Sequence, residues 1–249
     1  MRLLDARTLE FKEFFGKPTP RYAILSHTWG NDEVSYQDMI GYHKRKQIRN
    51  CAQVACGKGI NYVWIDTCCI DKSSSSELQE AINSMFCWYT NASLCCTYLA
   101  DVEQSIRCSE TAAAENPGFR CSRWFKRGWT LQELLAPSMD IFFNRTWGEI
   151  GTRDTLSEVI SDITAIERRY LKGYVAIHAP ISQRMLWLSG CETTRKDDIA
   201  YCALGIFDIN MPLLYGEGKR AFFRLQQEIL RGSNDASIFT WGFTGTGPP

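Results

Sequence analysis

The sequence has no excess of charge of either sign. Lys and Arg together number 28, Asp and Glu together number 28, and the formal net charge at neutral pH is zero. Proteins that coat nucleic acid or an anionic membrane surface carry a basic excess, because they neutralise many negative charges at once. We therefore expect neither nucleic acid nor a membrane among the partners of this chain.

Long apolar runs are also missing. No apolar run is long enough to cross a bilayer, which takes about 20 residues. The N-terminus has no secretory pattern, because Met1 is followed by an acidic residue, Asp5, before any apolar run develops. We expect a cytoplasmic protein whose 11 cysteines stay reduced.

The cysteines lack the CxxC spacing that lets ligands wrap a zinc ion. Two adjacent pairs occur instead, Cys68-Cys69 and Cys95-Cys96. We expect no metal, and we interpret these thiols as small buried apolar groups. A thiol hydrolase built on Cys68 or Cys69 with His27 has no local signature to support it.

The chain does have enough apolar material for a large core. Its 249 residues are 45% hydrophobic and 22% charged, which suits one large domain. Short apolar runs predict strands over residues 22–29, 61–66, 92–100 and 139–143. Three- and four-residue apolar spacing predicts helices over residues 36–59 with a break near Gly41, over 74–89, and over 129–135. Ser74 with Glu77 fits a capping box at the start of the second of these.

This alternation predicts an α/β fold, a parallel sheet flanked by helices. Beyond residue 150 the pattern becomes mostly helical, with helices expected over 155–170, 197–205 and 218–231. We divide the chain into an α/β core over 1–150, a helical C-terminal part of the same domain over 151–243, and a linker over 244–249.

Polar side chains gather where the predicted strands end. The first strand ends at His27 and Trp29, the second at Asp66, and the third at Asp101. Ligands of open parallel sheets bind outside the carboxyl ends of the strands. His27 and Trp29 are therefore candidate substrate-binding residues. Asp66 is another, although capping of the following helix is the more common role for such an aspartate.

Three long blocks of the sequence, in fixed order, resemble the HET (heterokaryon-incompatibility) domain of filamentous fungi. The blocks are residues 23–30 (AILSHTWG), 64–72 (WIDTCCIDK) and 122–134 (SRWFKRGWTLQEL), and a fourth similar stretch covers 195–218. The resemblance extends over nearly the whole chain. It implies a role in fungal non-self recognition, a form of innate immunity, and in programmed cell death, with an NTPase receptor as a fused or separate partner.

A more remote resemblance, in the order of the elements, links the chain to TIR domains. Residues 129–134 (WTLQEL) are similar to the Trp-Cys-Leu-x-Glu-Leu stretch of plant TIR domains, with Thr130 in place of the cysteine. In TIR enzymes the glutamate of that stretch is the catalytic residue of NAD hydrolysis. The resemblance implies a TIR/flavodoxin-like core, self-association into oligomers, and Glu133 as the catalytic residue. NAD is then the substrate, and no cofactor is needed.

One carboxylate is chemically adequate for this reaction. Nicotinamide leaves the cationic NAD ring as a neutral molecule, so a general acid is not required, and the carboxylate stabilises an oxocarbenium-like transition state. Trp129 and Glu133 lie four residues apart and share a helix face, where the indole can stack on the nicotinamide. The plainer alternative makes Trp129 a core anchor and Glu133 a solvated surface residue. Glu80 is the rival carboxylate, on the polar side of its helix.

A basic run precedes that helix: Arg120, Arg123, Lys126 and Arg127. Basic residues at a helix N-terminus suit a pyrophosphate, which makes Arg123 and Arg127 candidate substrate-binding residues. The same run, interleaved with aromatic residues, could stack RNA bases, and at least two of the four are expected in a solvated loop. Three residues of the C-terminal part could reach a phosphate or make internal contacts: Arg184, Arg195 and Tyr215.

Two functions follow from the sequence. The first is an NAD glycohydrolase that acts as a cell-death effector when it self-associates. The second is a non-enzymatic signalling module that triggers cell death by binding another protein. Polar and aromatic residues at three strand ends favour the first, and the lack of an unambiguous catalytic pair favours the second.

Overall fold

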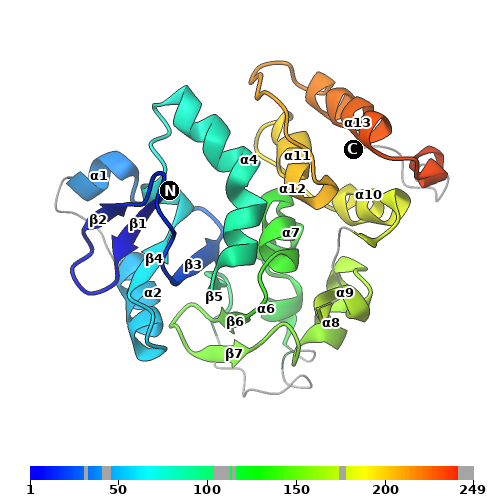
Figure 1. Cartoon of the computed structure of the whole chain (residues 1–249). Coiled ribbons are helices and arrows are strands. Elements are labelled where there is room, and N and C mark those ends of the chain that lie inside the picture. Colours follow the sequence, from blue (N-terminus) through cyan, green and yellow to red (C-terminus); the bar gives the residue numbers. More distant parts are fainter. Residues whose placement is uncertain (31–32, 41–45, 104–112, 114–115, 174–177, 241–249) are drawn as a thin grey trace.

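A seven-stranded sheet forms the centre of the N-terminal part of the chain (Figure 1). The structure, a computed structural model, describes residues 1–30, 33–40, 46–103, 113, 116–173 and 178–240. The strand order is β2-β1-β4-β3-β5-β6-β7. The strands are β1 (Arg2–Asp5), β2 (Phe11–Glu13), β3 (Tyr22–His27), β4 (Tyr62–Trp64), β5 (Leu94–Tyr98), β6 (Asp140–Phe143) and β7 (Glu149–Gly151).

The four central strands, β4-β3-β5-β6, are parallel. They are the four strands that the apolar runs predict, and β3 and β5 are buried along their whole length. Counted in chain order among themselves they lie 2-1-3-4, the flavodoxin-like order. The chain leaves β3 for β4 on one side and then crosses to β5 on the other, so the topological switch point lies between the carboxyl ends of β3 and β5.

The outer strands were not predicted. On one edge β1 pairs antiparallel with β4 and β2 with β1, and on the other edge β7 pairs antiparallel with β6. These strands are three or four residues long, and β2 is largely exposed. A run that short holds too few alternations of polar and apolar residues to be distinguished from a loop.

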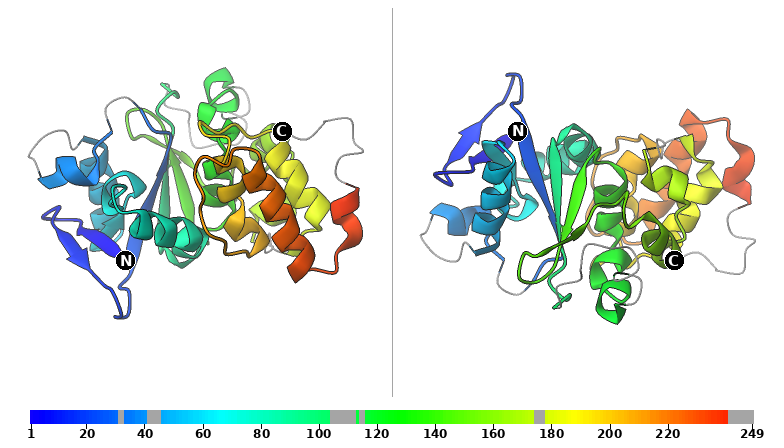
Figure 2. Two further views of the ribbon diagram at one scale, coloured as in Figure 1. Left: turned by 90° about the horizontal axis from the view of Figure 1, so that it is seen from above. Right: turned by 90° about the horizontal axis from the view of Figure 1, so that it is seen from below.

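Helices lie on both sides of the sheet, which Figure 2 shows close to edge-on. Those of the N-terminal part are α1 (Tyr36–Ile40), α2 (Lys46–Gly57), α3 (Asp66–Cys69), α4 (Ser75–Asn91), α6 (Pro117–Arg120), the 3-10 helix η1 (Arg123–Lys126) and α7 (Gly128–Leu135). Those of the C-terminal part are α8 (Ser157–Thr164), α9 (Arg168–Leu171), α10 (Ile181–Ser189), α11 (Asp198–Tyr201), α12 (Leu204–Phe207), α13 (Arg220–Gly232) and the 3-10 helix η3 (Ala236–Phe239).

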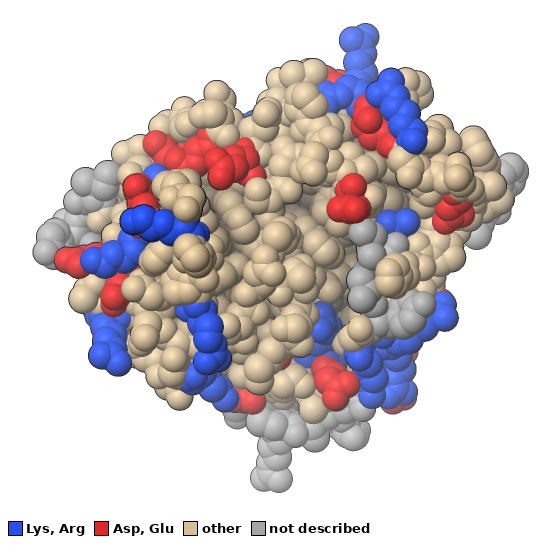
Figure 3. All heavy atoms as spheres, in the orientation of Figure 1, with Lys and Arg blue, Asp and Glu red and all other residues tan. Residues whose placement is uncertain are grey.

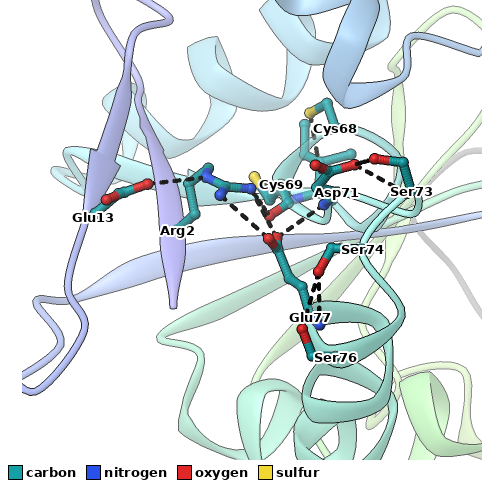
Figure 4. A network of polar contacts seen from close by, with 10 residues as sticks. Arg2, Glu13, Cys68, Cys69, Asp71, Ser73, Ser74, Ser76 and Glu77 are labelled. Atoms are coloured by element: carbon teal, nitrogen blue, oxygen red, sulfur yellow. Dashed lines mark hydrogen bonds and ion pairs between the residues drawn. The ribbon is translucent and has the colours of Figure 1, made fainter.

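Helix α4 begins where the sequence predicts it. Ser74 is the N-cap, and its side chain accepts a hydrogen bond from the backbone N–H of Glu77 at 3.3 Å. The reciprocal half of the capping box is absent, because the Glu77 carboxylate is engaged elsewhere (Figure 4). It accepts from the backbone N–H of Asp71 at 2.8 Å and from the guanidinium of Arg2 at 2.8 Å. The carboxylate therefore ties β1 and the α3–α4 loop to the start of α4.

Two of the predicted C-terminal helices are each divided in the structure. The helix expected over 155–170 is α8 and α9, because Ala165 adopts a left-handed conformation, φ 57°, that ends α8. The helix expected over 197–205 is α11 and α12. Helix α13 agrees with its prediction, and α10 was not anticipated.

The C-terminal helices pack closely on α4 and α7. Gly205 of α12 lies against Phe86 of α4 so tightly that a Cβ there would overlap the phenylalanine side chain. The C-terminal end of α7 is held by Arg153, whose guanidinium donates to the carbonyls of Leu134 at 2.5 Å and Pro137 at 2.7 Å. These contacts fix α7 between the sheet and the C-terminal helices.

The remaining expectations concern the C-terminal linker, membrane-spanning helices, metal ligands and the distribution of charge. The linker predicted over 244–249, and most of the stretch from 104 to 115, lie outside the described residues. Within the described part no helix has the length and apolar character of a membrane span, and no three His, Cys, Asp or Glu side chains are grouped to hold a metal. Both signs of charge lie around the margin of the face in Figure 3, with a broad uncharged area between them.

Candidate functional site

A pocket of about 580 Å³ opens beside the carboxyl ends of β3 and β4. Helices α7 and α4 contribute one side, the loops after the two strands a second, and the C-terminal part of the chain a third. Its lining consists of His27, Trp29, Asp66, Ile70, Lys72, Leu78, Ile82, Met85, Arg127, Trp129, Glu133, Glu192, Thr193, Thr194, Arg195, Asp198 and Tyr215. This is the place where open parallel sheets bind ligands.

Glu133 is buried, with 7% of its surface exposed. Its carboxylate accepts a hydrogen bond from the Ser26 hydroxyl at 2.5 Å, and Ser26 in turn accepts from the indole N–H of Trp124 at 2.8 Å. The alternative that Glu133 is a solvated surface residue is therefore wrong. The carboxylate therefore lies at the end of a short chain of hydrogen bonds that starts at Trp124 of η1 and passes through Ser26 of β3.

The pKa of Glu133 is raised from 4.5 to about 7, and burial is the largest cause. The negative charge of Asp66 raises it further, while the Ser26 hydrogen bond and the positive charges of His27 and Arg127 lower it. Because desolvation is the largest contribution, the cause is the environment of α7 rather than one partner. A carboxyl group with this pKa exchanges a proton readily at neutral pH.

The sequence of α7 explains how the glutamate reaches the pocket. Leu131, Leu134 and Leu135 are buried in the core, as predicted. Trp129 and Glu133, four residues apart, both line the pocket. The helix therefore presents its apolar stripe to the core and the Trp129–Glu133 face to the pocket.

His27 is also buried, and its Nε2 lies 3.0 Å from a carboxylate oxygen of Glu33, a partner that sequence reasoning missed. Burial lowers the pKa of His27, but the Glu33 hydrogen bond and the charges of Asp66, Glu33 and Glu133 outweigh it, so the pKa is raised. Nδ1 lies 3.9 Å from Asp66 Oδ1 and has no hydrogen-bond partner among the described residues.

Trp29 is the most exposed of the predicted pocket residues, at 45%. Its indole N–H donates to Asp66 Oδ2 at 2.8 Å. Asp66 is the first residue of α3, whose N-cap is Ile65 with no side-chain bond, so the prediction that Asp66 caps the helix is wrong. The Lys72 ammonium lies 3.6 Å from the Trp29 ring centroid and the Arg127 guanidinium carbon 5.9 Å from it. The indole face is thus flanked by two cations.

Comparison with known proteins bears on this arrangement. The family model described as "Heterokaryon incompatibility protein (HET)" matches residues 22–121. The chain is also 46% identical over 230 residues to "Vegetative incompatibility protein HET-E-1" of Podospora anserina. This chain carries a HET domain. The alignment with the Podospora protein covers 88% of this chain and 17% of that protein, so the chain spans about a sixth of its relative. No solved structure matches the chain.

The segment matched by the HET family model contributes one side of the pocket, with His27, Trp29 and Asp66. Glu133 lies beyond the matched segment, on α7. Six of the seven predicted site residues therefore line the pocket: His27, Trp29, Asp66, Arg127, Trp129 and Glu133. The pocket is therefore assembled from parts of the chain more than 100 residues apart.

Arg123 is the exception. Its side chain is 71% exposed, lies outside the pocket lining and faces Asp101, with 3.7 Å between the charged atoms. The 3-10 turn of η1 directs it away from α7. Arg120 and Lys126 line a different pocket of about 460 Å³, on the far side of α7. Of the basic run only Arg127 reaches the candidate site.

Two rival chemistries lose support. Glu80 is exposed on α4, as its default interpretation predicts, and does not line the pocket. The Cys68 and Cys69 thiols are buried, and a hydrogen bond between them together with burial raises the pKa of Cys68 well above its usual value. A thiolate nucleophile is therefore disfavoured beside His27.

The C-terminal part supplies the last side of the pocket, which the sequence indicated only through Arg195 and Tyr215. The Arg195 guanidinium carbon lies 4.8 Å from the Tyr215 ring centroid, and Asp198 lies beside them. Arg184, the third phosphate candidate, is buried; it donates to the carbonyl of Ile206 at 2.9 Å and makes an internal contact.

Proposed function

We propose that this HET domain acts in fungal non-self recognition as a cell-death effector, and that it does so by cleaving NAD at the nicotinamide N-glycosidic bond. The observation that carries the proposal is Glu133: a buried carboxyl group in the pocket beside the carboxyl ends of β3 and β4, with a pKa raised to about 7. Carboxyl groups with such shifts concentrate at functional sites.

The reaction needs few groups. The C1′–N bond of the nicotinamide ribose breaks, and its electron pair neutralises the ring nitrogen, so nicotinamide leaves uncharged. The Glu133 carboxylate stabilises the positive charge that develops on the ribose. Water then attacks C1′ and gives its proton to Glu133, which releases it to solvent. The balance is NAD and water to ADP-ribose, nicotinamide and one proton.

The other side chains of the pocket fit a dinucleotide substrate. Trp129 offers its indole ring to the nicotinamide ring, while the Trp29 ring is already in contact with the Lys72 ammonium. Arg127 offers a guanidinium to the diphosphate, and it lies close enough to Glu133 to lower the pKa of that carboxyl group. Asp66 offers an acceptor to a ribose hydroxyl beside the unpartnered Nδ1 of His27.

We further propose that the domain acts when copies associate, and that a fused or separate NTPase receptor brings them together. The TIR resemblance is the basis of this expectation. It predicts that NAD loss per molecule rises with protein concentration, which a dilution series measures directly. Cleavage that is independent of concentration over the range where copies associate would contradict it.

The competing function is a non-enzymatic module that signals by binding another protein. One observation favours it: the Glu133 carboxylate is already hydrogen-bonded inside the protein, to Ser26, as a structural polar network would be. Under this alternative the carboxylate positions α7 and no substrate is consumed.

NAD loss with purified protein at high concentration separates the two. We compare wild type with Glu133→Gln, which keeps the shape of the side chain, and with Glu80→Gln as a control on an exposed carboxylate. Circular dichroism checks folding. The enzyme function predicts loss of NAD in wild type and the control and none in Glu133→Gln. Absence of NAD loss in wild type at every concentration, in a domain that still kills cells, would leave the binding module.

A further inference from the structure

The third side of the pocket comes from the helical C-terminal part. Helix α7 contacts β3 on one side and α11 on the other, so the Glu133 face lies between the strand loops and the C-terminal helices (Figure 1). Two buried polar atoms of pocket-lining residues have no hydrogen-bond partner among the described residues. One is His27 Nδ1, from the strand side, and the other is Asp198 Oδ1, from the helical side.

Arg195 supplies a cation on the helical side. Its guanidinium stacks on the Tyr215 ring, with 4.8 Å between the guanidinium carbon and the ring centroid. Stacking orients the planar group and leaves its N–H edges free, and the residue is exposed at the mouth of the pocket. An oriented guanidinium is the side chain best suited to bind a phosphate through two parallel hydrogen bonds.

Asp198 supplies an acceptor next to that cation. Burial raises the pKa of its carboxyl group, whereas hydrogen bonding to the Tyr215 and Trp129 side chains and the charge of Arg195 lower it by less. Its Oδ1 has no hydrogen-bond partner among the described residues, and in native proteins such a buried atom usually has a partner that is missing from the structure. A ligand hydroxyl or amino group would supply the missing hydrogen bond.

We propose that Arg195, Asp198 and Tyr215 form a second binding subsite, which holds the phosphate and ribose of a second nucleotide unit. The oriented cation and the carboxylate oxygen without a partner match two parts of a nucleotide, the phosphate and the sugar hydroxyls, while the Tyr215 ring holds the guanidinium in place. The proposal rests on the proposed function, in which Glu133 takes the nicotinamide ribose on the strand side. The ligand class is then a dinucleotide that spans α7, and a mononucleotide fills only half of the pocket.

The subsite can be tested by binding, without turnover. Isothermal titration calorimetry with ADP-ribose as the probe compares wild type with Arg195→Ala, Arg195→Lys and Asp198→Asn. The control is Arg231→Ala, an exposed arginine of α13 outside the pocket. Loss of one charged hydrogen-bonding partner weakens binding by about tenfold or more. We expect that loss for Arg195→Ala, partial recovery for Arg195→Lys, and wild-type affinity for the control.

Nicotinamide mononucleotide is the second probe, because it lacks the second nucleotide unit. Its affinity is expected to be the same in wild type and Arg195→Ala. No binding of ADP-ribose to wild type, equal ADP-ribose affinity in wild type and Arg195→Ala, or equal weakening of both probes would each overturn the subsite. Thermal unfolding of every variant excludes a general loss of structure.

The outcome also separates this proposal from the proposed function. If Arg195→Ala weakens ADP-ribose while wild type consumes no NAD, the subsite stands and the hydrolase fails. If wild type consumes NAD and Arg195→Ala changes neither the ADP-ribose affinity nor the KM for NAD, the hydrolase stands and the subsite fails.

Discussion

The burial of Glu133 predicts that replacing it with glutamine stabilises the protein, and that the gain depends on pH. In the folded state the pKa of this carboxyl group is raised from 4.5 to about 7, with burial as the main cause. Ionising it inside the protein therefore costs free energy of folding that an amide avoids. Glutamine keeps the size of the side chain and an oxygen that can accept from Ser26, so the change removes the charge and little else.

The sign follows from proton binding. Between pH 4.5 and 7 the unfolded chain has released the Glu133 proton and the folded chain still holds it, so the free energy of unfolding falls as pH rises. One pKa unit corresponds to about 1.4 kcal/mol, and the two-and-a-half-unit difference gives a total of about 3 kcal/mol. Most of it, roughly 2 to 3 kcal/mol, is lost between pH 5 and pH 8.

The measurement is urea unfolding of wild type and Glu133→Gln at pH 5 and pH 8. The difference between the two proteins should move in favour of the variant by about 2 to 3 kcal/mol on going to pH 8. In thermal unfolding this corresponds to a relative gain of roughly 4 to 12 °C for a domain of this size. Asp140, whose pKa burial raises to about 6, titrates in both proteins and so cancels in the difference.

A difference that is the same at both pH values would refute the reasoning, because Glu133 would then titrate near its ordinary pKa. The control is Glu80→Gln. That carboxylate is exposed on α4, so its replacement should give no pH-dependent gain.

Three further substitutions test the elements that hold the site. Ser26→Ala removes a hydrogen bond that lowers the pKa of Glu133, so the pKa measured by carboxyl NMR should rise. Gly205→Ala places a Cβ inside the Phe86 side chain and should destabilise the domain by about 1 to 3 kcal/mol in urea unfolding. Arg153→Ala leaves two buried carbonyls at the end of α7 unpaired and should cost about 3 kcal/mol, with weakened ADP-ribose binding because α7 loosens.

Each of these has a result that contradicts it. A Glu133 pKa that falls in Ser26→Ala would mean that the hydroxyl favours the protonated form of the acid. Gly190→Ala is the control for Gly205, because a Cβ at position 190 meets nothing within 4 Å, and equal effects at both glycines would exclude the close contact. An Arg153→Ala domain with unchanged stability would show that solvent satisfies the freed carbonyls.

The parallel core could be predicted because its strands are buried on both faces. Such strands appear as short apolar runs, and their carboxyl ends meet at one edge of the sheet, which brings His27 and Asp66 together. The antiparallel edge strands are too short to give a pattern. The same limit applies to Ala165, where a left-handed residue ends α8 without any sequence signal.

The environment of Glu133 could not be predicted, because distant segments create it. Helix spacing places Glu133 beside Trp129, but its burial depends on the strand loops and on the C-terminal helices that pack around α7. Arg123 and Arg127 are equivalent in the sequence, and only the short 3-10 turn between them decides that one enters the pocket and the other faces Asp101. Local sequence patterns therefore predict which residues share a helix face, but not which distant segments of the chain pack against that face.

The free-energy penalty of ionising the buried Glu133 carboxyl group helps to distinguish an enzyme from a binding module. If the carboxylate only positioned α7 through Ser26, glutamine would make the same hydrogen bond without the roughly 3 kcal/mol penalty at neutral pH. A structural network gains nothing from the charge, whereas an oxocarbenium-like transition state requires it. The module alternative thus predicts that Glu133→Gln is more stable and equally active in killing cells. The enzyme predicts a variant that is more stable and inactive, the trade-off expected when a strained site is kept for its chemistry.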